Sequence, residues 1–364
     1  MRVLFVVPGM GPGGSERVTA NLANHLARQG HEVGLLFFVG EKSFYELDAR
    51  VQCFPLNSTM DRRSSLTFLF SMAANFRNCL KAFRHCCESF RPDKVVSFQF
   101  EADTVVSVCR KGRKWAWISS EINDPTNRSR LISYLTKRNY RFMDLLVCQT
   151  KMVLDFYKDL PVRKILLPNA VDLSVIPGAV DEGKETVFVS AGRLSSQKNY
   201  PLLIRSFHKA CQQSAEPCRL IIYGEGPDRP KLEALIRELQ AEEISLPGTA
   251  DDLLQRIRDA AAFVISSDYE GCSNALLEAV LLGLPVISAD HPTGDAKELA
   301  KRGYVLTVGV GNEEEMTKAL LSLMNDPQRR REMRLRSRSF REDPEIVTSC
   351  LQWEKAIQEA GEKL

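Results

Sequence analysis

The sequence lacks the features that would place it in several special classes of protein. Its 364 residues contain no apolar run near the roughly 18 residues that a membrane span requires. The short run Arg2–Val7 ends at Pro8-Gly9 without a small-residue cleavage site, so we predict a buried strand there and not a secretion signal. The ten cysteines include no Cys-x-x-Cys pair. Free thiols in a reducing cytoplasm are therefore expected, most of them buried in or near apolar segments, as at Cys53, Cys109, Cys148 and Cys218.

Several nucleotide-binding and metal-binding motifs are also absent. There is no Gly-x-Gly-x-x-Gly fingerprint, although Gly9-x-Gly11 superficially suggests one, and no Walker loop. There is no Asp-x-Asp beside an expected strand end and no His/Cys cluster with metal-ligand spacing. If the chain acts on a ligand with a diphosphate leaving group, the charge of that group would have to be neutralised by protein cations and helix N-termini instead of a metal ion. We therefore expect neither a metal nor a cofactor.

The composition is that of an ordinary globular protein, with 44% hydrophobic and 26% charged residues. The length favours two domains over a single core. The net charge of +3 is unevenly spread, because residues 1–175 carry 25 basic and 16 acidic side chains and the remainder carries 24 and 30. A basic first half predicts an anionic partner, which the charge alone leaves open as a phosphate-bearing ligand, a lipid headgroup or a nucleic acid.

Both halves of the chain alternate short apolar runs with helical stretches, which predicts parallel sheets covered on both faces. The fold class is therefore α/β, with two doubly wound Rossmann-like domains facing across a cleft at the carboxyl ends of their strands. The expected domains are residues 1–170 and 171–342, followed by a C-terminal helical segment, residues 343–364, that packs back toward the first domain. The expected strands are Arg2–Val7, Glu32–Phe38, Lys94–Phe98, Trp115–Ser119, Leu145–Cys148, Thr186–Ala191, Arg219–Tyr223, Ala262–Ser266 and Pro285–Ser288. The main expected helices are Ser15–Gln29, Leu66–Phe90, Asn127–Phe142, Tyr200–Cys211, Asp228–Leu239, Leu253–Ala260, Ala275–Leu282 and Asn312–Asn325.

The most informative stretch is residues 268–278, where Glu270 and Glu278 flank the start of an expected helix. Ser273 or Asn274 is a natural N-cap for this helix, and Gly283 followed by Pro285 closes it. The N–H groups of residues 272–275 then point out between two carboxylates, which is an anion site flanked by hydrogen-bond acceptors. A nucleotide sugar has a matching pattern of a phosphate beside sugar hydroxyls.

Two glycine-containing loops follow the first strand of each domain. In residues 192–199, Arg193 and Lys198 could clamp a diphosphate, or form a solvated basic turn; the position beside Glu270 favours the clamp. In residues 10–17, Gly13-Gly14 allows a ligand to approach the backbone and Ser15 can cap the helix. A tight turn without a ligand would have the same sequence.

The expected helix Leu66–Phe90 combines five phenylalanines with basic residues. It fits either an amphipathic helix on anionic lipid or a core helix with a solvated face. The two interpretations stay open at this point. The residues concerned are Phe68, Phe70, Phe76, Phe83 and Phe90, with Arg77, Lys81, Arg84 and Arg91.

Taken in order, the motifs resemble those of the family-4 retaining glycosyltransferases, which have the two-domain GT-B fold, and most of all the bacterial polysaccharide and glycolipid assembly enzymes. The similarity extends over essentially the whole chain. It is carried by Gly13–Glu16, Ser120–Pro125, Cys148–Thr150, Leu167–Asn169, Gly192-Arg193 with Gln197–Asn199, Tyr223–Pro227, Ser267–Gly271, Asn274-Ala275, Glu278-Ala279 and Gly283–Ser288.

The resemblance implies roles for individual residues. Arg193 and Lys198 hold the donor diphosphate, Glu278 accepts hydrogen bonds from the ribose, and Glu270 meets the hydroxyls of the donor sugar. The backbone of Gly192 and of Gly271, Cys272, Ser273, Asn274 and Ala275 supports sugar and phosphate. Gly14 approaches the donor from the first domain, with Ser15, Glu121 and Asn123 on the acceptor side. Two positions depart from the family pattern: Ile122 replaces a basic residue or histidine, and Asp295 stands where a second glycine is common.

The resemblance thus predicts a metal-independent hexosyltransferase that moves a sugar from a nucleotide diphosphate donor, UDP by preference, to a glycan or lipid-linked glycan with retained configuration. It implies a cytoplasmic location with peripheral contact to the inner face of an anionic membrane, and no nucleic-acid partner. A nucleotide-sugar epimerase on a similar frame and a non-catalytic nucleotide-sugar or lipid-binding protein remain the alternatives.

Overall fold

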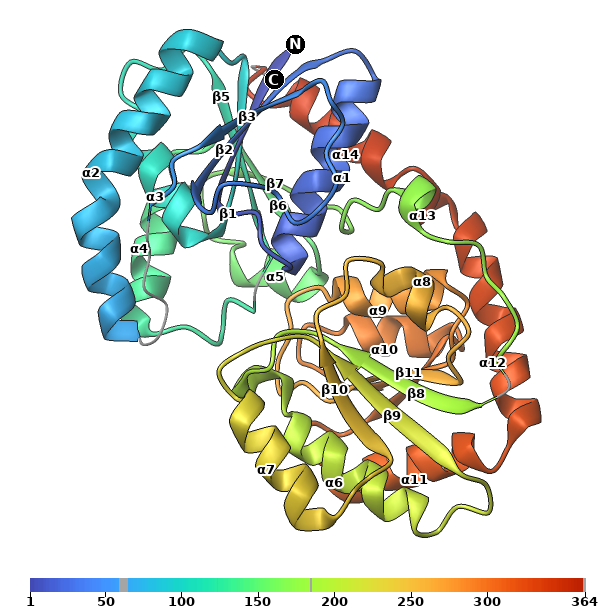
Figure 1. Cartoon of the computed structure of the whole chain (residues 1–364). Coiled ribbons are helices and arrows are strands. Elements are labelled where there is room, and N and C mark those ends of the chain that lie inside the picture. The colour runs from blue at the N-terminus through green and yellow to red at the C-terminus, as the bar shows by residue number, and fades with distance from the viewer. Residues whose placement is uncertain (59–64, 123, 184, 363–364) are drawn as a thin grey trace. The chain divides into compact units, whose positions relative to one another are not determined.

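The computed structural model describes residues 1–58, 65–122, 124–183 and 185–362; between residues 65 and 74 it describes only the helical backbone. The chain forms two compact units (Figure 1). Unit 1 comprises Met1–Asp172 and the segment that begins at Thr348, and unit 2 comprises Leu173–Val347. The chain therefore passes from one unit to the other twice.

Unit 1 is built on a seven-stranded sheet with the order β3-β2-β1-β4-β5-β6-β7, and all neighbouring strands are parallel. The order reverses between β1 and β4, as expected for a doubly wound sheet. The strands are β1 (Arg2–Gly9), β2 (Glu32–Val39), β3 (Val51–Pro55), β4 (Lys94–Phe98), β5 (Ala116–Glu121), β6 (Leu145–Cys148) and β7 (Arg163–Leu166).

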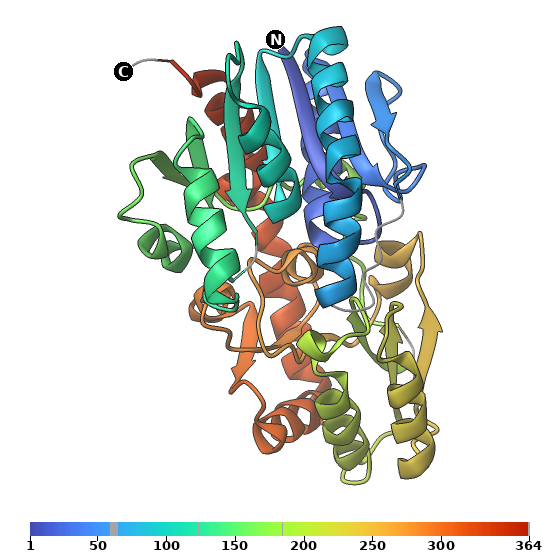
Figure 2. The ribbon, with the colours of Figure 1, turned by 90° about the vertical axis from the view of Figure 1, so that its left-hand side faces the viewer.

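Helices cover both faces of this sheet. α1 (Gly14–Arg28) and α14 (Ser349–Glu359) pack on one face, where Trp353 is fully buried and its indole N–H donates to the Pro168 carbonyl at 2.8 Å. The opposite face, seen in Figure 2, is covered by α2 (Ser65–Phe90), α3 (Gln99–Cys109), α4 (Arg130–Tyr140) and α5 (Lys151–Phe156). Because apolar side chains meet helices on both sides, the central strands β1 and β4 are buried at every position after the first.

Unit 2 repeats this architecture on a six-stranded parallel sheet with the order β10-β9-β8-β11-β12-β13. Its strands are β8 (Thr186–Ala191), β9 (Cys218–Tyr223), β10 (Ile244–Gly248), β11 (Ala262–Ile265), β12 (Val286–Ala289) and β13 (Val305–Val308). One face carries α6 (Tyr200–Cys211), α7 (Arg229–Leu239) and α11 (Glu313–Met324), and Figure 1 shows α8 (Leu253–Ile257), α9 (Asn274–Leu281) and α10 (Asp295–Lys301) on the other. The unit ends with α12 (Pro327–Ser339) and α13 (Pro344–Val347).

The architecture confirms the predicted fold class of two parallel-sheet, Rossmann-like domains. Short elements at the sheet edges escaped prediction, among them β3, β7, β10 and β13. Several local predictions are wrong, and two of them concern residues discussed above. Cys53 is exposed because it lies on the edge strand β3, and helix α1 begins one residue earlier than predicted, with Gly13 and not Ser15 at its N-cap.

Within the described residues, helix α2 is a core helix with a solvated basic face. Phe83 and Phe90 are buried, Phe76 packs against the same cluster, and Arg77 and Arg84 are exposed. Phe68 and Phe70 lie outside the described side chains. None of the helices in the described part of the chain combines the length and the apolar character needed to cross a bilayer.

Candidate functional site

The first part of the candidate site is the loop that joins β8 to α6. It contains Gly192 and a short 3-10 turn, Ser196–Lys198, and reaches α6 through Asn199, whose backbone is left-handed with φ of 44°. A Cβ atom on Gly192 would lie 3.0 Å from Lys198 Cε and 3.0 Å from the Tyr200 hydroxyl. A larger residue at position 192 would have to displace Lys198 or Tyr200, so glycine is favoured here.

The next loop, which follows β9, locks the first one in place. The N–H groups of Gly192 and Leu194 donate to the carbonyls of Tyr223 and Glu225 at 3.0 and 2.9 Å. A Cβ on Gly224 would lie 1.9 Å from the Gly192 carbonyl oxygen, so no other residue fits without moving the backbone. The Tyr-Gly-Glu-Gly segment therefore acts as a rigid support for the loop that carries Arg193 and Lys198.

Lys198 and Glu270 are brought together by this arrangement. Lys198 Nζ lies 2.6 Å from Glu270 Oε1, which also accepts a hydrogen bond of 2.6 Å from the Ser267 hydroxyl. Glu270 is 8% exposed. Ser267, which lies in one of the quoted motifs but was given no role, is thus a second donor to the same carboxylate oxygen.

Backbone and amide contacts hold the two loops on either side of this ion pair. Gln197 Nε2 donates to the Tyr269 carbonyl at 2.9 Å, and the Asp268 N–H donates back to the Gln197 carbonyl at 2.8 Å. Asn199 Nδ2 donates to Asp268 Oδ1 at 2.7 Å. The relative positions of the basic loop and the acidic loop are therefore fixed by several independent hydrogen bonds.

Arg193 differs from Lys198 in its environment. Its side chain is exposed, and among the residues that the structure describes its guanidinium has no hydrogen-bond or ion-pair partner. It lies five residues before Lys198 on the same loop. The loop therefore offers one cation that is already paired and one that is available to an incoming anion.

The N-terminus of α9 is capped as predicted, with the Ser273 hydroxyl accepting from the Leu276 N–H at 3.4 Å. The prediction that the backbone N–H groups of residues 272–275 are all open to a ligand is wrong at Ser273, however. The Ser273 N–H donates to Asp295 Oδ2 at 2.9 Å, so a carboxylate of the protein already takes one of these donors. Gly271 and Ala275 remain as candidate amides for a ligand. Glu278 lies about one turn into α9 and is half-buried.

A small cavity connects these elements in the interior of unit 2. It is bounded by side chains from β8, the basic loop, the acidic loop and the start of α9: Ser190, Lys198, Tyr200, Ser267, Ser273 and Ala275 among others. Tyr200 is 2% exposed, and burial raises the pKa of its hydroxyl above its usual value. Sequence patterns did not identify Tyr200, because a tyrosine at a helix start carries no motif of its own.

In unit 1, the turn at Gly13-Gly14 also has a carboxylate of its own. Glu16 is 9% exposed, and its Oε2 accepts from the Ser15 hydroxyl at 2.7 Å. A Cβ on Gly13 would lie 2.2 Å from this oxygen. Gln99, held at φ of 73°, donates to the Ser15 hydroxyl in turn. A carboxylate at the start of α1 disfavours a phosphate there and suits sugar hydroxyls instead.

Glu121 ends β5 and is 2% exposed. Arg128 forms a two-pronged ion pair with it, at 2.8 and 2.5 Å, and the Tyr157 hydroxyl donates to it at 2.7 Å. Burial and the neighbouring Glu121 carboxylate raise the pKa of Tyr157. This carboxylate is therefore a buried structural centre, which the prediction of an acceptor-side contact did not anticipate. Ile122 packs against the apolar core beside it, and Asn123 lies outside the described residues.

Comparison with known proteins accounts for nearly the whole chain. The family model described as Glycosyltransferase Family 4 matches residues 12–175, and the model described as Glycosyl transferases group 1 matches residues 177–340. A curated Campylobacter jejuni protein is 25% identical over 99% of both chains; its name describes an alpha-1,4-N-acetyl-D-galactosaminyltransferase acting on GalNAc-alpha-(1->4)-GalNAc-alpha-(1->3)-diNAcBac-PP-undecaprenol. A second Campylobacter jejuni enzyme, named for 4-alpha-N-acetylgalactosaminyl transfer to N-acetylgalactosamine-N,N'-diacetylbacillosaminyl-diphospho-undecaprenol, is 27% identical over 88% of this chain and 90% of its own.

Solved structures show the same fold at lower sequence identity. Sucrose-phosphate synthase from Thermosynechococcus elongatus superposes with a TM-score of 0.83 at 15% identity, covering 99% of both chains. Anabaena HepE, solved in complex with UDP and glucose, gives a TM-score of 0.74 at 17% identity, covering 99% of this chain and all of its own. Together with the two family models, these matches establish that the chain belongs to the family-4 glycosyltransferases of the GT-B fold.

Proposed function

We propose that this glycosyltransferase moves a sugar from UDP to a hydroxyl of a lipid-linked glycan, with retention of configuration and without a metal ion. The observation that carries the proposal is the paired Lys198 and Glu270 beside the start of α9, with the exposed Arg193 on the same loop. Such a site offers cations to a diphosphate and a carboxylate to a sugar.

The ion pair suggests how donor binding proceeds. An arriving diphosphate attracts Lys198 Nζ and weakens its hold on Glu270 Oε1. The Glu270 carboxylate then becomes available to accept hydrogen bonds from the hydroxyls of the donor sugar. Ser267 keeps the carboxylate oriented during this exchange, because it donates to the same oxygen.

The remaining donor-side roles follow from position. Arg193 contacts the diphosphate from the exposed side of the loop, and amides of Gly271 and Ala275 add dipoles to the same charge. Glu278, one turn into α9, accepts hydrogen bonds from the ribose. As the bond to the sugar breaks, negative charge grows on the diphosphate, and preorganised cations and amides stabilise it more than they stabilise the intact donor.

On the acceptor side, Gly14, Ser15 and Asn123 contact the glycan, and Glu121 acts as a positioning residue through Arg128 and Tyr157. The choice of a lipid-linked acceptor is supported by the names of the two Campylobacter relatives, both of which act on undecaprenol-diphosphate-linked glycans. UDP as the nucleotide is supported by the UDP complex of HepE. The basic first half of the chain fits a cytoplasmic enzyme that contacts an anionic membrane peripherally.

A thermal-shift panel of UDP-, GDP- and ADP-sugars tests the donor assignment, because a ligand that binds the folded state raises the melting temperature. We expect UDP-sugars alone to stabilise the protein, and EDTA to leave this shift and the turnover unchanged. A shift that appears only with a divalent ion would refute metal independence.

Two further experiments test the alternative functions. Incubation with the nucleotide sugar alone, without an acceptor, tests for an epimerase, because an epimerase would isomerise the sugar. Donor binding without UDP release in the presence of lipid-linked glycan extract would favour the non-catalytic alternative.

A further inference from the structure

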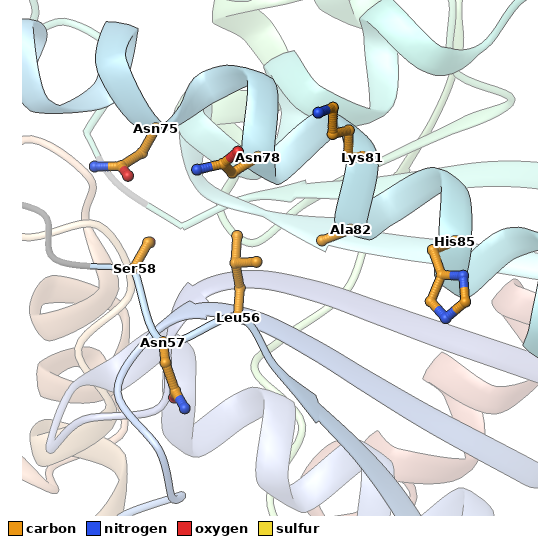
Figure 3. A pocket seen from close by; sticks show the side chains of 8 residues that line it. All are labelled: Leu56, Asn57, Ser58, Asn75, Asn78, Lys81, Ala82 and His85. Atoms are coloured by element: carbon orange, nitrogen blue, oxygen red, sulfur yellow. The ribbon is translucent and has the colours of Figure 1, made fainter.

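Unit 1 contains a second hollow, of about 490 Å³, between helix α2 and the segment that follows strand β3 (Figure 3). This volume lies in the range of small-molecule sites, about 300–1,000 Å³. Figure 3 shows Leu56 and Ser58 directed toward α2 from the strand side. The lining residues are Leu56, Asn57, Ser58, Asn75, Asn78, Lys81, Ala82 and His85.

Both walls of the hollow are structurally fixed. The Ser58 N–H and hydroxyl both donate to the Phe38 carbonyl, at 2.9 and 2.5 Å, which anchors the end of the segment to β2. Asn57 has φ of 52°, a left-handed conformation that asparagine tolerates better than most residues. On the helix side, residues 75, 78, 82 and 85 follow the three- and four-residue spacing of one helical face. The polar groups therefore stand on rigid elements.

The lining is rich in carboxamides, which suit a sugar that carries an acetamido group. Among the described residues that form it there are three asparagines, one serine, one histidine and one lysine, and no carboxylate. Figure 3 shows the Asn57 side chain directed away from α2, so the carboxamides that face the hollow are those of Asn75 and Asn78. A carboxamide both donates and accepts, so it can pair with an acetamido group through two hydrogen bonds. Leu56 and Ala82 offer an apolar floor for the C–H face of a pyranose ring.

We propose that this hollow binds an acetamido sugar of the acceptor glycan, a proposal that rests on the glycosyl transfer proposed above. β3 is separated from β1 by one intervening strand, which places their ends about 10 Å apart in the sheet. The Gly13-Gly14 turn, where the acceptor glycan is proposed to bind, follows β1. The hollow would therefore hold a different sugar of the same glycan. It would thereby select acceptors by the length and acetamido content of their glycan.

The test uses saturation-transfer NMR on the full chain with two disaccharides, N,N′-diacetylchitobiose and cellobiose, which differ in their acetamido groups. We expect a clear signal for diacetylchitobiose and a much weaker one for cellobiose. The variant Asn78→Trp fills the hollow from an exposed helix position and should abolish the diacetylchitobiose signal. The control Arg77→Ala changes the adjacent exposed residue, outside the lining, and should leave the signal intact.

The proposal is overturned by an unchanged signal in Asn78→Trp, by no diacetylchitobiose signal in the unmodified protein, or by equal signals for the two disaccharides. Displacement of diacetylchitobiose by inorganic phosphate would identify an anion site and also overturn it. A UDP thermal shift measured on the same samples reports on the donor site and on folding. Loss of the UDP shift in every sample would count against the proposed transfer alone. A normal UDP shift, together with a diacetylchitobiose signal that Asn78→Trp leaves unchanged, would count against the sugar site alone.

Discussion

Lys198 and Glu270 face each other across 2.6 Å, with 18% and 10% of their side chains exposed. Arg193, on the same loop, is exposed and has no such partner among the described residues. Removing one member of a buried ion pair leaves an uncompensated charge, which costs about 3–5 kcal/mol. The two cations of the proposed clamp should therefore differ in what their loss does to stability, although both should matter for turnover.

We expect Arg193→Ala and Lys198→Ala each to lower turnover by about two orders of magnitude or more, because losing one preorganised charge-stabilising group costs about 2.7–4 kcal/mol. Only Lys198→Ala should also lower the urea midpoint of unfolding. Initial rates with saturating donor and urea titrations measure the two effects. Lys209→Ala, an exposed lysine on α6, is the control and should change neither. Near-normal turnover in Arg193→Ala would remove that residue from the clamp.

The buried carboxyl group of Asp103 predicts how the stability of the folded protein depends on pH. It is 1% exposed, Ser97 and Ser119 donate to its Oδ1 at 2.6 and 2.8 Å, and burial raises its pKa to about 8. The folded state therefore holds a proton that the unfolded state releases near pH 4. This contribution to stability is complete below about pH 4 and is lost as pH rises toward 8, at up to about 1.4 kcal/mol per pH unit.

Asp103→Asn should flatten this decline, since an amide mimics the neutral acid and does not titrate. Urea midpoints of the variant and the unmodified protein, compared at about pH 5 and about pH 8, measure the difference. Ser97 and Ser119 can still donate to the amide oxygen, so the variant should fold normally at the lower pH. Parallel pH dependence of the two proteins would show that Asp103 is ionised in the folded state.

At the scale of elements, helix α12 anchors the segment that leads into unit 2. Arg330, Arg334 and Arg338 recur every four residues and so lie along one face of the helix. Arg330 pairs with Glu182 at 2.8 Å, Arg338 pairs with Asp181 at 2.7 Å, and Arg334 donates to the Val180 carbonyl at 3.0 Å. Residues 180–182, which precede β8, are thus held in place by α12.

Arg334 supplies the most enclosed of these contacts, at 3% exposure, and donates to the carbonyls of Arg258 and Ala260 as well. Arg334→Met would remove the donor to those carbonyls, at about 1–3 kcal/mol for each group that stays unsatisfied. We expect a clearly lower urea midpoint for unfolding. Arg331→Met, on the exposed face of the same helix, should change the midpoint little. Equal midpoints for the two variants would mean that the carbonyls find other donors.

At the scale of the whole molecule, hydrophobic patterning predicted the sheets because parallel strands such as Lys94–Phe98 and Thr186–Ala191 are short, mostly apolar runs. Both have the predicted bounds. Edge strands such as β3, with its pattern of exposed residues, carry no such signal. The candidate site was predictable where a motif fixes the backbone, as at Gly192 and Ser273. It was not predictable where a partner comes from a distant segment, as with Ser273 and Asp295 or Glu121 and Arg128.

The position of α14 has a consequence for biosynthesis. Unit 2 is a single continuous stretch, whereas the core of unit 1 is completed only by Trp353 and its neighbours, which the ribosome makes after the whole of unit 2. Nascent domains ordinarily fold in the order in which they emerge. The apolar surface beside α1 therefore stays uncovered until α14 has been made, so unit 1 needs chaperone protection throughout the translation of unit 2.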